Sequence, residues 1–247
     1  MLEAQDWRVT EIGSFRSTKG TSVWLRDYVP NDVPQARFVT CGYESAVAES
    51  DSNQGIQDLA RTLLDLLAIF RRNTQTQKRP LCFVCHSLGG VVLKEALIIS
   101  SKATEPKHRY LQEVLMATHG LVLMGVPNLG LRHNQLETVV KGRPNKGFVR
   151  DLLLQSDGGP SQFLERLTRD FADLDRQRLP PFDIISYYET KNSPTLAVLG
   201  KRLFAMKGPK DFMVTKISAE LIGHLARDMD HLPSNTDHRG LVRFEHS

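Results

Sequence analysis

The stretch RPLCFVCHSLGG (residues 79–90) runs from an apolar segment into a histidine, a serine and then two glycines. Residues 81–86 show no polar alternation, which is typical of a central parallel strand buried on both faces. A strand, a tight turn on a serine and a helix that leaves at once together form a nucleophile elbow, which presents the serine for attack. The stretch therefore predicts that Ser87 is a nucleophile.

The turn itself carries most of this interpretation. Small residues two before and two after the serine let such a turn close, and Gly89 fills the second of these positions. Cys85 stands where the G-x-S-x-G pattern has its first glycine, which strains the turn without forbidding it. We expect the N–H of Leu88 to be the first oxyanion-hole donor, since a helix N-terminus favours negative charge. The alternative is that Ser87 only caps a buried helix, as in any βα unit.

A nucleophilic serine needs an acid and then a histidine, and in sheets of this type they follow it in that chain order. The run FDIISYY (residues 182–188) predicts a strand, and Glu189 stands at its end. A carboxylate there can orient and charge-stabilise an imidazole. The alternative is a surface glutamate at a strand end.

Two Asp-His pairs near the end of the chain compete for the base, at residues 230–231 and 237–238. His238 stands at a loop-to-helix junction with an apolar helix face behind it, whereas His231 lies in mid-loop before Leu-Pro. His224 falls in a helical window and has the pattern of a structural residue. We favour His238, which would take the serine proton before an acyl-enzyme forms.

Short apolar runs alternate with amphipathic windows along the whole chain. We expect strands over 36–43, 81–86, 120–127, 182–188 and 211–218, and helices over 51–72, from 89 onwards and over 161–177. This alternation predicts one α/β domain over residues 1–247, with a mostly parallel sheet and helices on both faces. Residues 129–160 are richer in Gly, Asn, Asp and Pro, and predict either a lid or substrate wall above the sheet or a solvated connector.

Composition narrows the function further. The chain has 247 residues and a formal charge of +4, and its basic residues are scattered, so a nucleic-acid partner is not expected. The three cysteines stand in apolar stretches, which predicts buried, reduced thiols and a cytosol-like compartment. No stretch approaches the roughly 20 apolar residues of a membrane span, although peripheral membrane contact stays open. The chemistry calls for no cofactor and no metal.

Nearly the whole chain resembles the lipase-like serine hydrolase domains of the SERAC-type (serine-active-site-containing) family, a domain type also found at the N-terminus of fungal NACHT/NLR-like receptors. The stretches that carry the resemblance are VWLRDYVP, ARFVTCGYES, RPLCFVCHSLGGVVLKEAL, LVLMGVPNLGLRH, IISYYETKNSPT and DHRGLVRF. The resemblance implies an α/β-hydrolase fold with Ser87, Glu189 and His238 as the triad. It also implies ester or lipid-ester substrates, NLR-type protein partners, and association with membranes of mitochondria or the endoplasmic reticulum.

One departure from that family concerns the N-terminal region. The family begins with an apolar strand ending in His-Gly-Leu-x-Gly, whose loop supplies the second oxyanion N–H. This chain has no histidine before His86 and no apolar strand before Trp7. We therefore expect the first family strand to be lacking, unless the Gly13 to Gly20 stretch replaces its loop.

Three hypotheses follow. The first is an active carboxylic ester hydrolase. The second is a catalytically impaired hydrolase-fold module for signalling or binding, and the third is a purely structural α/β domain.

Overall fold

The computed structural model describes residues 15, 22–43, 52–132, 136, 140–195, 197–198, 204–205, 207–220 and 229–244. Contacts divide the chain into two compact units, one of residues Met1–Tyr43 with Val242–Ser247 and the other of residues Glu44–Leu241. The single domain expected over residues 1–247 stays a prediction. Within the described ranges, no helix combines the length and the apolar character that a bilayer crossing requires.

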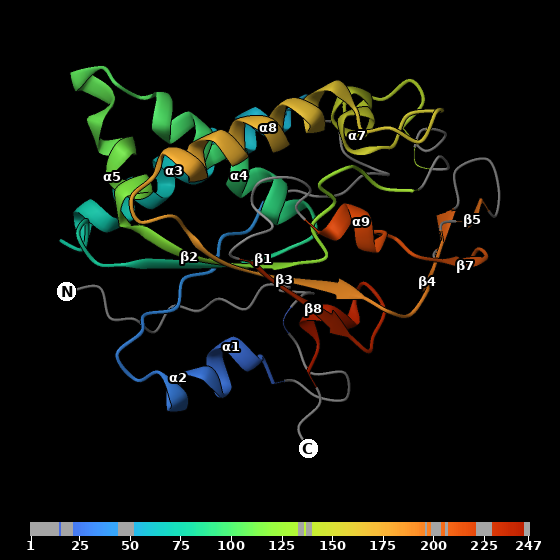
Figure 1. Ribbon diagram of the computed structural model, residues 1–247, viewed down its shortest axis with the longest axis horizontal. Coiled ribbons are helices and arrows are strands. Elements are labelled where there is room, and N and C mark those ends of the chain that lie inside the picture. Colours follow the sequence, from blue (N-terminus) through green and yellow to red (C-terminus); the bar gives the residue numbers. More distant parts are fainter. Residues whose placement is uncertain are drawn as a thin grey trace. The chain divides into compact units, whose positions relative to one another are not determined.

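A parallel sheet lies at the centre of the larger unit (Figure 1). Its strands are β1 (Leu81–His86), β2 (Thr118–Met124), β3 (Asp183–Glu189) and β8 (Met229–Ser234), in the order β1-β2-β3-β8. Every pairing in this sheet is parallel, so the carboxyl ends of its strands share one edge. That edge is where open α/β sheets bind ligands. The predicted α/β class with a mostly parallel sheet is confirmed.

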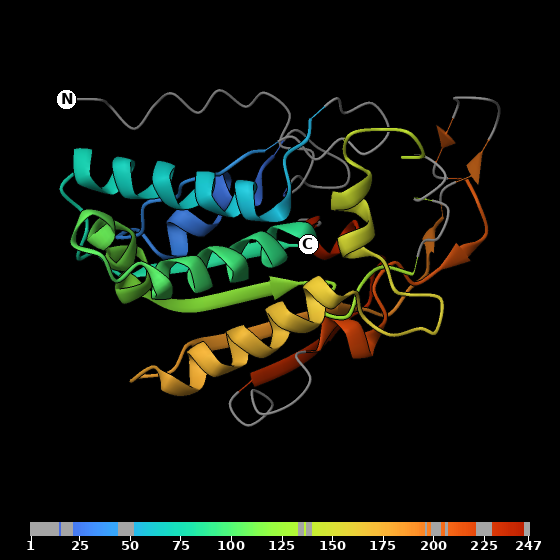
Figure 2. The same ribbon diagram turned by 90° about the horizontal axis from the view of Figure 1, so that it is seen from above.

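Helices α3 (Ile56–Asn73), α4 (Leu88–Lys102), α5 (Arg109–Ala117) and α8 (Gln162–Gln177) form a layer against one face of this sheet (Figure 1). Helix α4 lies between α3 and α8 (Figure 2). It is buried along most of its length, as a central helix must be. Ser161 caps α8 by accepting a hydrogen bond of 3.2 Å from the N–H of Leu164, as its sequence predicts.

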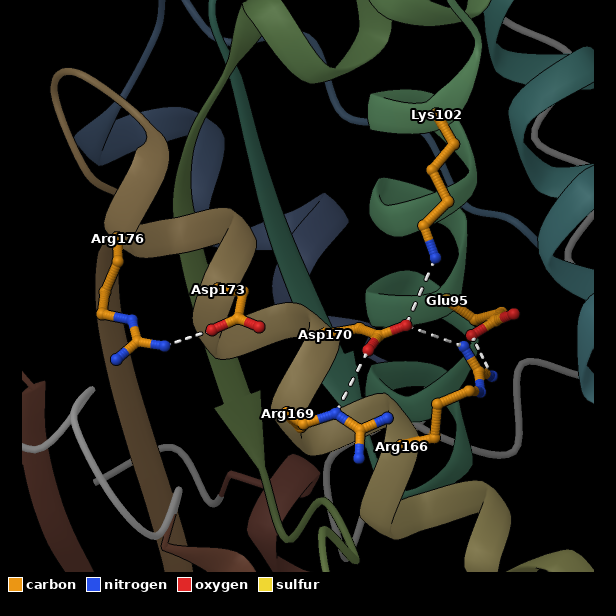
Figure 3. A network of polar contacts seen from close by, with 7 residues as sticks. All are labelled: Glu95, Lys102, Arg166, Arg169, Asp170, Asp173 and Arg176. Carbon is orange, nitrogen blue, oxygen red and sulfur yellow. Dashed lines mark hydrogen bonds and ion pairs between the residues drawn. The ribbon is translucent and has the colours of Figure 1, made fainter.

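A charged network joins α8 to α4 (Figure 3). The buried carboxylate of Glu95 accepts a hydrogen bond of 2.8 Å from Arg166. Asp170 lies 3.2 Å from the ammonium of Lys102 and 3.5 Å from the guanidinium of Arg166. Glu95 is buried whereas Arg166 is partly exposed, and their contact ties the helix that follows the nucleophile to its neighbour.

The remaining described elements are short. They are η1 (Pro106–His108), α7 (Lys146–Leu152), α9 (Lys216–Ala219) and η3 (Gly240–Val242), and two antiparallel pairs, β4 (Ser193–Pro194) with β7 (Lys210–Asp211) and β5 (Ala197–Val198) with β6 (Phe204–Ala205). The unit at the chain ends holds α1 (Trp24–Asp27) and α2 (Val29–Asp32). There the Trp24 indole donates to the carbonyl of Val242 at 3.0 Å and packs edge-on against Phe244.

Two predicted strands are wrong. Residues 36–43 are irregular and mostly exposed, with Val39 54% exposed. They pair with no described strand, so the extended conformation gains no hydrogen bonds there. Residues 211–218 contribute only Asp211 to β7 and then enter α9, because the hydroxyl of Thr215 accepts from the N–H of Ser218 and caps a helical turn. The last described strand is instead β8, which contains His231, predicted to lie in a loop.

The burial predicted for β1 and the cysteines also needs correction. Strand β1 stands at one end of the described strand order, and most of its residues are only half-buried. Cys82 on β1 and Cys41 are exposed, whereas Cys85 is half-buried, and none of the three cysteines forms a disulfide. An apolar run alone does not distinguish a central strand from one with an open side.

The segment 129–160 has a small core of its own. Val140, Val149 and Leu153 are buried together, with Leu131, Leu136 and Phe148 packed around them. Leu131 bridges to Leu153, and Gly130 reaches this geometry with φ at 126°. A Cβ at position 130 would lie 3.0 Å from the backbone nitrogen of Leu154 and 3.1 Å from the carbonyl carbon of Leu153. The described residues of this segment thus pack on one another, and its role, as a lid or as a connector, stays a prediction.

Candidate active site

Ser87 has the backbone geometry of a nucleophile elbow. It follows β1 directly and has φ 51° and ψ −125°, a conformation that non-glycine residues rarely adopt. Its N–H donates to the carbonyl of Met124 at 2.9 Å, and its own carbonyl accepts from the N–H of Gly90 at 3.1 Å. Such strained backbone costs on the order of 1–3 kcal/mol and concentrates at functional sites. A serine that merely caps a helix needs no such strain.

Close packing of α4 against the end of β2 depends on Gly90. A Cβ at this position would lie 2.3 Å from Cγ2 of Val126, well inside van der Waals contact. Leu88 is the first residue of α4, so its N–H has no partner within the helix. Its oxyanion role, and the roles of Cys85 and Gly89 in closing the turn, stay predictions.

Glu189 is the last residue of β3 and is 2% exposed. Its Oε1 accepts a hydrogen bond of 2.7 Å from the N–H of Val214, and its Oε2 lies 3.7 Å from Nδ1 of His238. Burial raises the pKa of Glu189 to about 7, and the charge of Asp237 acts in the same direction. The Val214 and Ser193 hydrogen bonds oppose this shift, because donors stabilise the carboxylate.

His238 and Ser87 both contact the end of β2. The ring of His238 packs against Gly125, where an added Cβ would lie 3.0 Å from both Nδ1 and Cε1 of the ring. Gly125 has φ 58° and directly follows Met124, whose carbonyl accepts the N–H of Ser87. The nucleophile and the proposed base therefore contact neighbouring residues of one short turn.

The loops that carry the acid and the base are tied to each other. Thr190, next to Glu189, donates its N–H to the carbonyls of Ser234 and Thr236 at 3.1 and 3.2 Å. Lys191 donates to Thr236 at 3.0 Å. Gly240 permits the tight return, since a Cβ there would collide with the Thr236 hydroxyl. These contacts set the acid and the base at a fixed separation.

Two further residues hold His238, and the sequence pattern predicts neither of them. Nε2 of His86 lies 2.9 Å from the carbonyl of His238, and a carbonyl only accepts, so His86 donates from Nε2. The two rings are 4.7 Å apart, and burial lowers the pKa of His86. The hydroxyl of Ser193 accepts from the N–H of His238 at 3.1 Å and also binds the carboxylate of Glu189.

The competing histidines can now be weighed against His238. His231 pairs in register with Ser186, three residues before the end of β3, which places it about 10 Å along the strand from Glu189. It cannot pair with that carboxylate. His224 lies outside the described residues, as does all of the Gly13 to Gly20 stretch except Phe15.

Comparison with known families agrees with this geometry. The family model described as "Putative serine esterase (DUF676)" matches residues 20–147, just over half of the chain, and its match includes the elbow at Ser87. The chain belongs to this family. Glu189 and His238 lie beyond the matched residues, so their roles depend on the contacts described above.

The similar proteins include SERAC1 from two vertebrates, which confirms the predicted SERAC-type resemblance. SERAC1 of Bos taurus is 23% identical over 190 residues, which cover 75% of this chain and 27% of SERAC1. SERAC1 of Danio rerio is 25% identical over 219 residues, which cover 86% and 30%. The chain thus spans less than a third of these relatives. The relation to fungal receptors stays a prediction.

Two solved structures are also similar. The Bacillus licheniformis lipase BlEst2 superposes with a TM-score of 0.48 at 16% identity, covering 77% of this chain and 70% of the lipase. Phospholipase PlaB from Legionella pneumophila gives a TM-score of 0.46 at 15% identity, covering 67% of this chain and 34% of PlaB.

Proposed function

We propose that this DUF676 member hydrolyses carboxylic esters through Ser87, His238 and Glu189. The observation that carries the proposal is the strained Ser87 at the end of β1, bonded to the same turn against which the His238 ring packs. A structural serine has no use for this conformation, whereas a nucleophile needs it to expose its Oγ.

The reaction would proceed in two balanced halves. Oγ of Ser87 adds to the ester carbonyl carbon while its proton passes to Nε2 of His238. The bond to the alcohol oxygen then breaks, and the imidazolium gives its proton to the departing alkoxide, which leaves an acyl-enzyme. A water molecule next gives a proton to His238 and adds to the acyl carbon, and Ser87 recovers its proton as the acid departs.

Glu189 would orient His238 and stabilise its charged form. The 3.7 Å between Oε2 and Nδ1 is longer than a hydrogen bond, and such contacts often tighten only when substrate is bound. An imidazolium at this distance favours the ionised carboxylate, even though burial raises its pKa to about 7. The Leu88 N–H would bind the developing oxyanion, with a second donor expected from another loop.

A series of p-nitrophenyl esters of increasing acyl length tests the proposal and compares short esters with lipid-like ones. We expect turnover by the wild type and a loss of at least about 10³-fold in His238→Ala, whereas His231→Ala, on strand β8, should retain activity. The impaired signalling module predicts no turnover by any variant. Equal turnover by wild type and His238→Ala would contradict the triad.

A further inference from the structure

A fully buried lysine stands near the nucleophile, and the proposed reaction does not use it. Lys94 lies on α4, is 1% exposed, and donates from Nζ to Oδ1 of Asn128. Its ammonium also faces the ring of Phe171, 5.4 Å from the ring centroid. Burying an amine is costly unless it is hydrogen-bonded, so this contact needs an explanation.

Asn128 joins α4 to α9 and α8. Its Nδ2 donates to the carbonyl of Ala219 at 3.1 Å, and its backbone N–H donates to the carbonyl of Ser218 at 2.9 Å. Its own carbonyl accepts from the hydroxyl of Thr168 at 3.2 Å. A side chain with an amide at one end can accept from the lysine and donate to α9 at the same time.

Helix α9 in turn fixes a donor to the proposed acid. Thr215 caps α9, and Val214 just before it donates its N–H to Glu189 at 2.7 Å. Ser186 on β3 also donates to the carbonyl of Ala219, at 3.0 Å. A continuous set of contacts thus leads from the nucleophile helix through Asn128 to the backbone that holds Glu189.

We propose that Lys94 and Asn128 form a buried positioning pair that sets α9 against α4 and so holds the Val214 N–H on the carboxylate of Glu189. The inference rests on the proposed function for its effect on catalysis, but not for its effect on α9. Lys94 and Asn128 touch no reacting atom. They act by keeping the acid's donor in place.

The surroundings of Lys94 decide how it titrates. Burial lowers its pKa to about 7, and the Cys85 thiol on β1 opposes this shift. The nearest ion pair on its own helix is Glu95 with Arg166 of α8, and on α9 Lys216 lies 3.6 Å from Glu220. Among the described residues, no carboxylate forms an ion pair with Lys94. Its amine is therefore held by the neutral amide of Asn128, and no negative charge balances it when it is protonated.

The test compares Lys94→Met with Lys102→Met, a matched control at the last residue of α4 whose lysine pairs only on the surface. Amide hydrogen exchange in residues 212–220 reports the position of α9 without any need for activity. We expect exchange at least about 10-fold faster in Lys94→Met, because Oδ1 of Asn128 is left buried without its donor, and unchanged exchange in Lys102→Met. Equal exchange in all three proteins would overturn the inference.

Activity supplies the second readout. Without its Val214 donor, Glu189 binds its proton more tightly, so the acid limb of kcat/KM against pH should move to higher pH in Lys94→Met while KM stays constant. A uniform fall in kcat/KM without that movement would count against positioning. If the wild type shows no turnover that depends on Ser87, the proposed function fails and the exchange result still decides this inference.

A second substitution covers the outcome that Lys94→Met does not fold. Asn128→Asp keeps an oxygen for the lysine but replaces the donor to Ala219 with an acceptor. The pair it forms with Lys94 is charged and keeps the buried amine partnered. Residues 212–220 should again exchange at least about 10-fold faster, and wild-type exchange in this variant would overturn the inference.

Discussion

At the scale of single residues, the site depends on side chains that hold the backbone of the proposed base. His86 and Ser193 bind the carbonyl and the N–H of His238, so the backbone of the base is gripped at both of its polar groups. No sequence pattern predicts that either residue binds the backbone of His238. Ser193 belongs to a two-residue strand, and the elbow pattern that contains His86 assigns a role to Ser87 and not to the histidine before it.

Removing the Ser193 hydroxyl should change the pH dependence of the reaction. In Ser193→Ala the carboxylate of Glu189 loses a donor that lowers its pKa, so the acid limb of kcat/KM should move to higher pH. Ser193→Thr keeps the hydroxyl and should restore the wild-type limb. The measurement is a pH–rate profile with a short ester, and identical limbs in Ser193→Ala and wild type would show that the hydroxyl does not act on Glu189.

Two substitutions of His86 separate its ring from its hydrogen bond. His86→Phe keeps a ring against His238 but leaves the His238 carbonyl unpaired, and should lower the free energy of unfolding by about 1–3 kcal/mol. His86→Gln keeps a donor near the position of Nε2 and should lose less. Urea unfolding measures both, and a larger loss in His86→Gln would assign the effect to the ring.

At the scale of elements, the contact between α4 and the end of β2 allows the elbow to form. Gly90→Ala places a Cβ 2.3 Å from a methyl of Val126, which should cost about 1–3 kcal/mol of stability through overpacking. Val126→Ala removes that methyl, so the double variant should recover most of the loss. Urea unfolding of the four proteins gives the coupling energy, and additive effects would show that the two residues are not in conflict.

At the scale of the whole molecule, two buried groups impose opposite pH dependences on stability. The pKa of Glu189 is raised to about 7, so its favourable contribution is present below pH 4.5 and is lost as pH rises through 7. The pKa of Lys94 is lowered to about 7, so its favourable contribution is present above pH 10.5 and is lost as pH falls through 7. Together they predict that these two groups stabilise the fold least near pH 7.

Urea unfolding at pH 5, 7 and 9 checks this prediction. Glu189→Gln should flatten the change between pH 5 and 7 and leave that between 7 and 9, whereas Lys94→Met should do the reverse. Parallel pH curves for both variants and the wild type would mean that neither group titrates in its window.

The whole molecule also shows what could be predicted from the sequence. The strand, turn and helix around Ser87 depend on a local pattern, and the structure has all three. Glu189 ends β3 as its sequence predicts and lies 3.7 Å from His238, whereas the catalytic roles of both stay predictions. The strand expected over 36–43 failed, because β-propensity is expressed only where a partner strand is present. The pairing of Lys94 with Asn128 joins residues 34 apart, and no single-sequence pattern encodes it.

The most direct test of the account is a fluorophosphonate probe followed by intact mass and peptide mapping. The reagent bonds only to a serine whose Oγ is activated by its neighbours. We predict one adduct per chain, located at Ser87, with none on Ser87→Ala and strongly slowed labelling in His238→Ala. Labelling of the wild type no faster than of Ser87→Ala would contradict the claim that Ser87 is a working nucleophile.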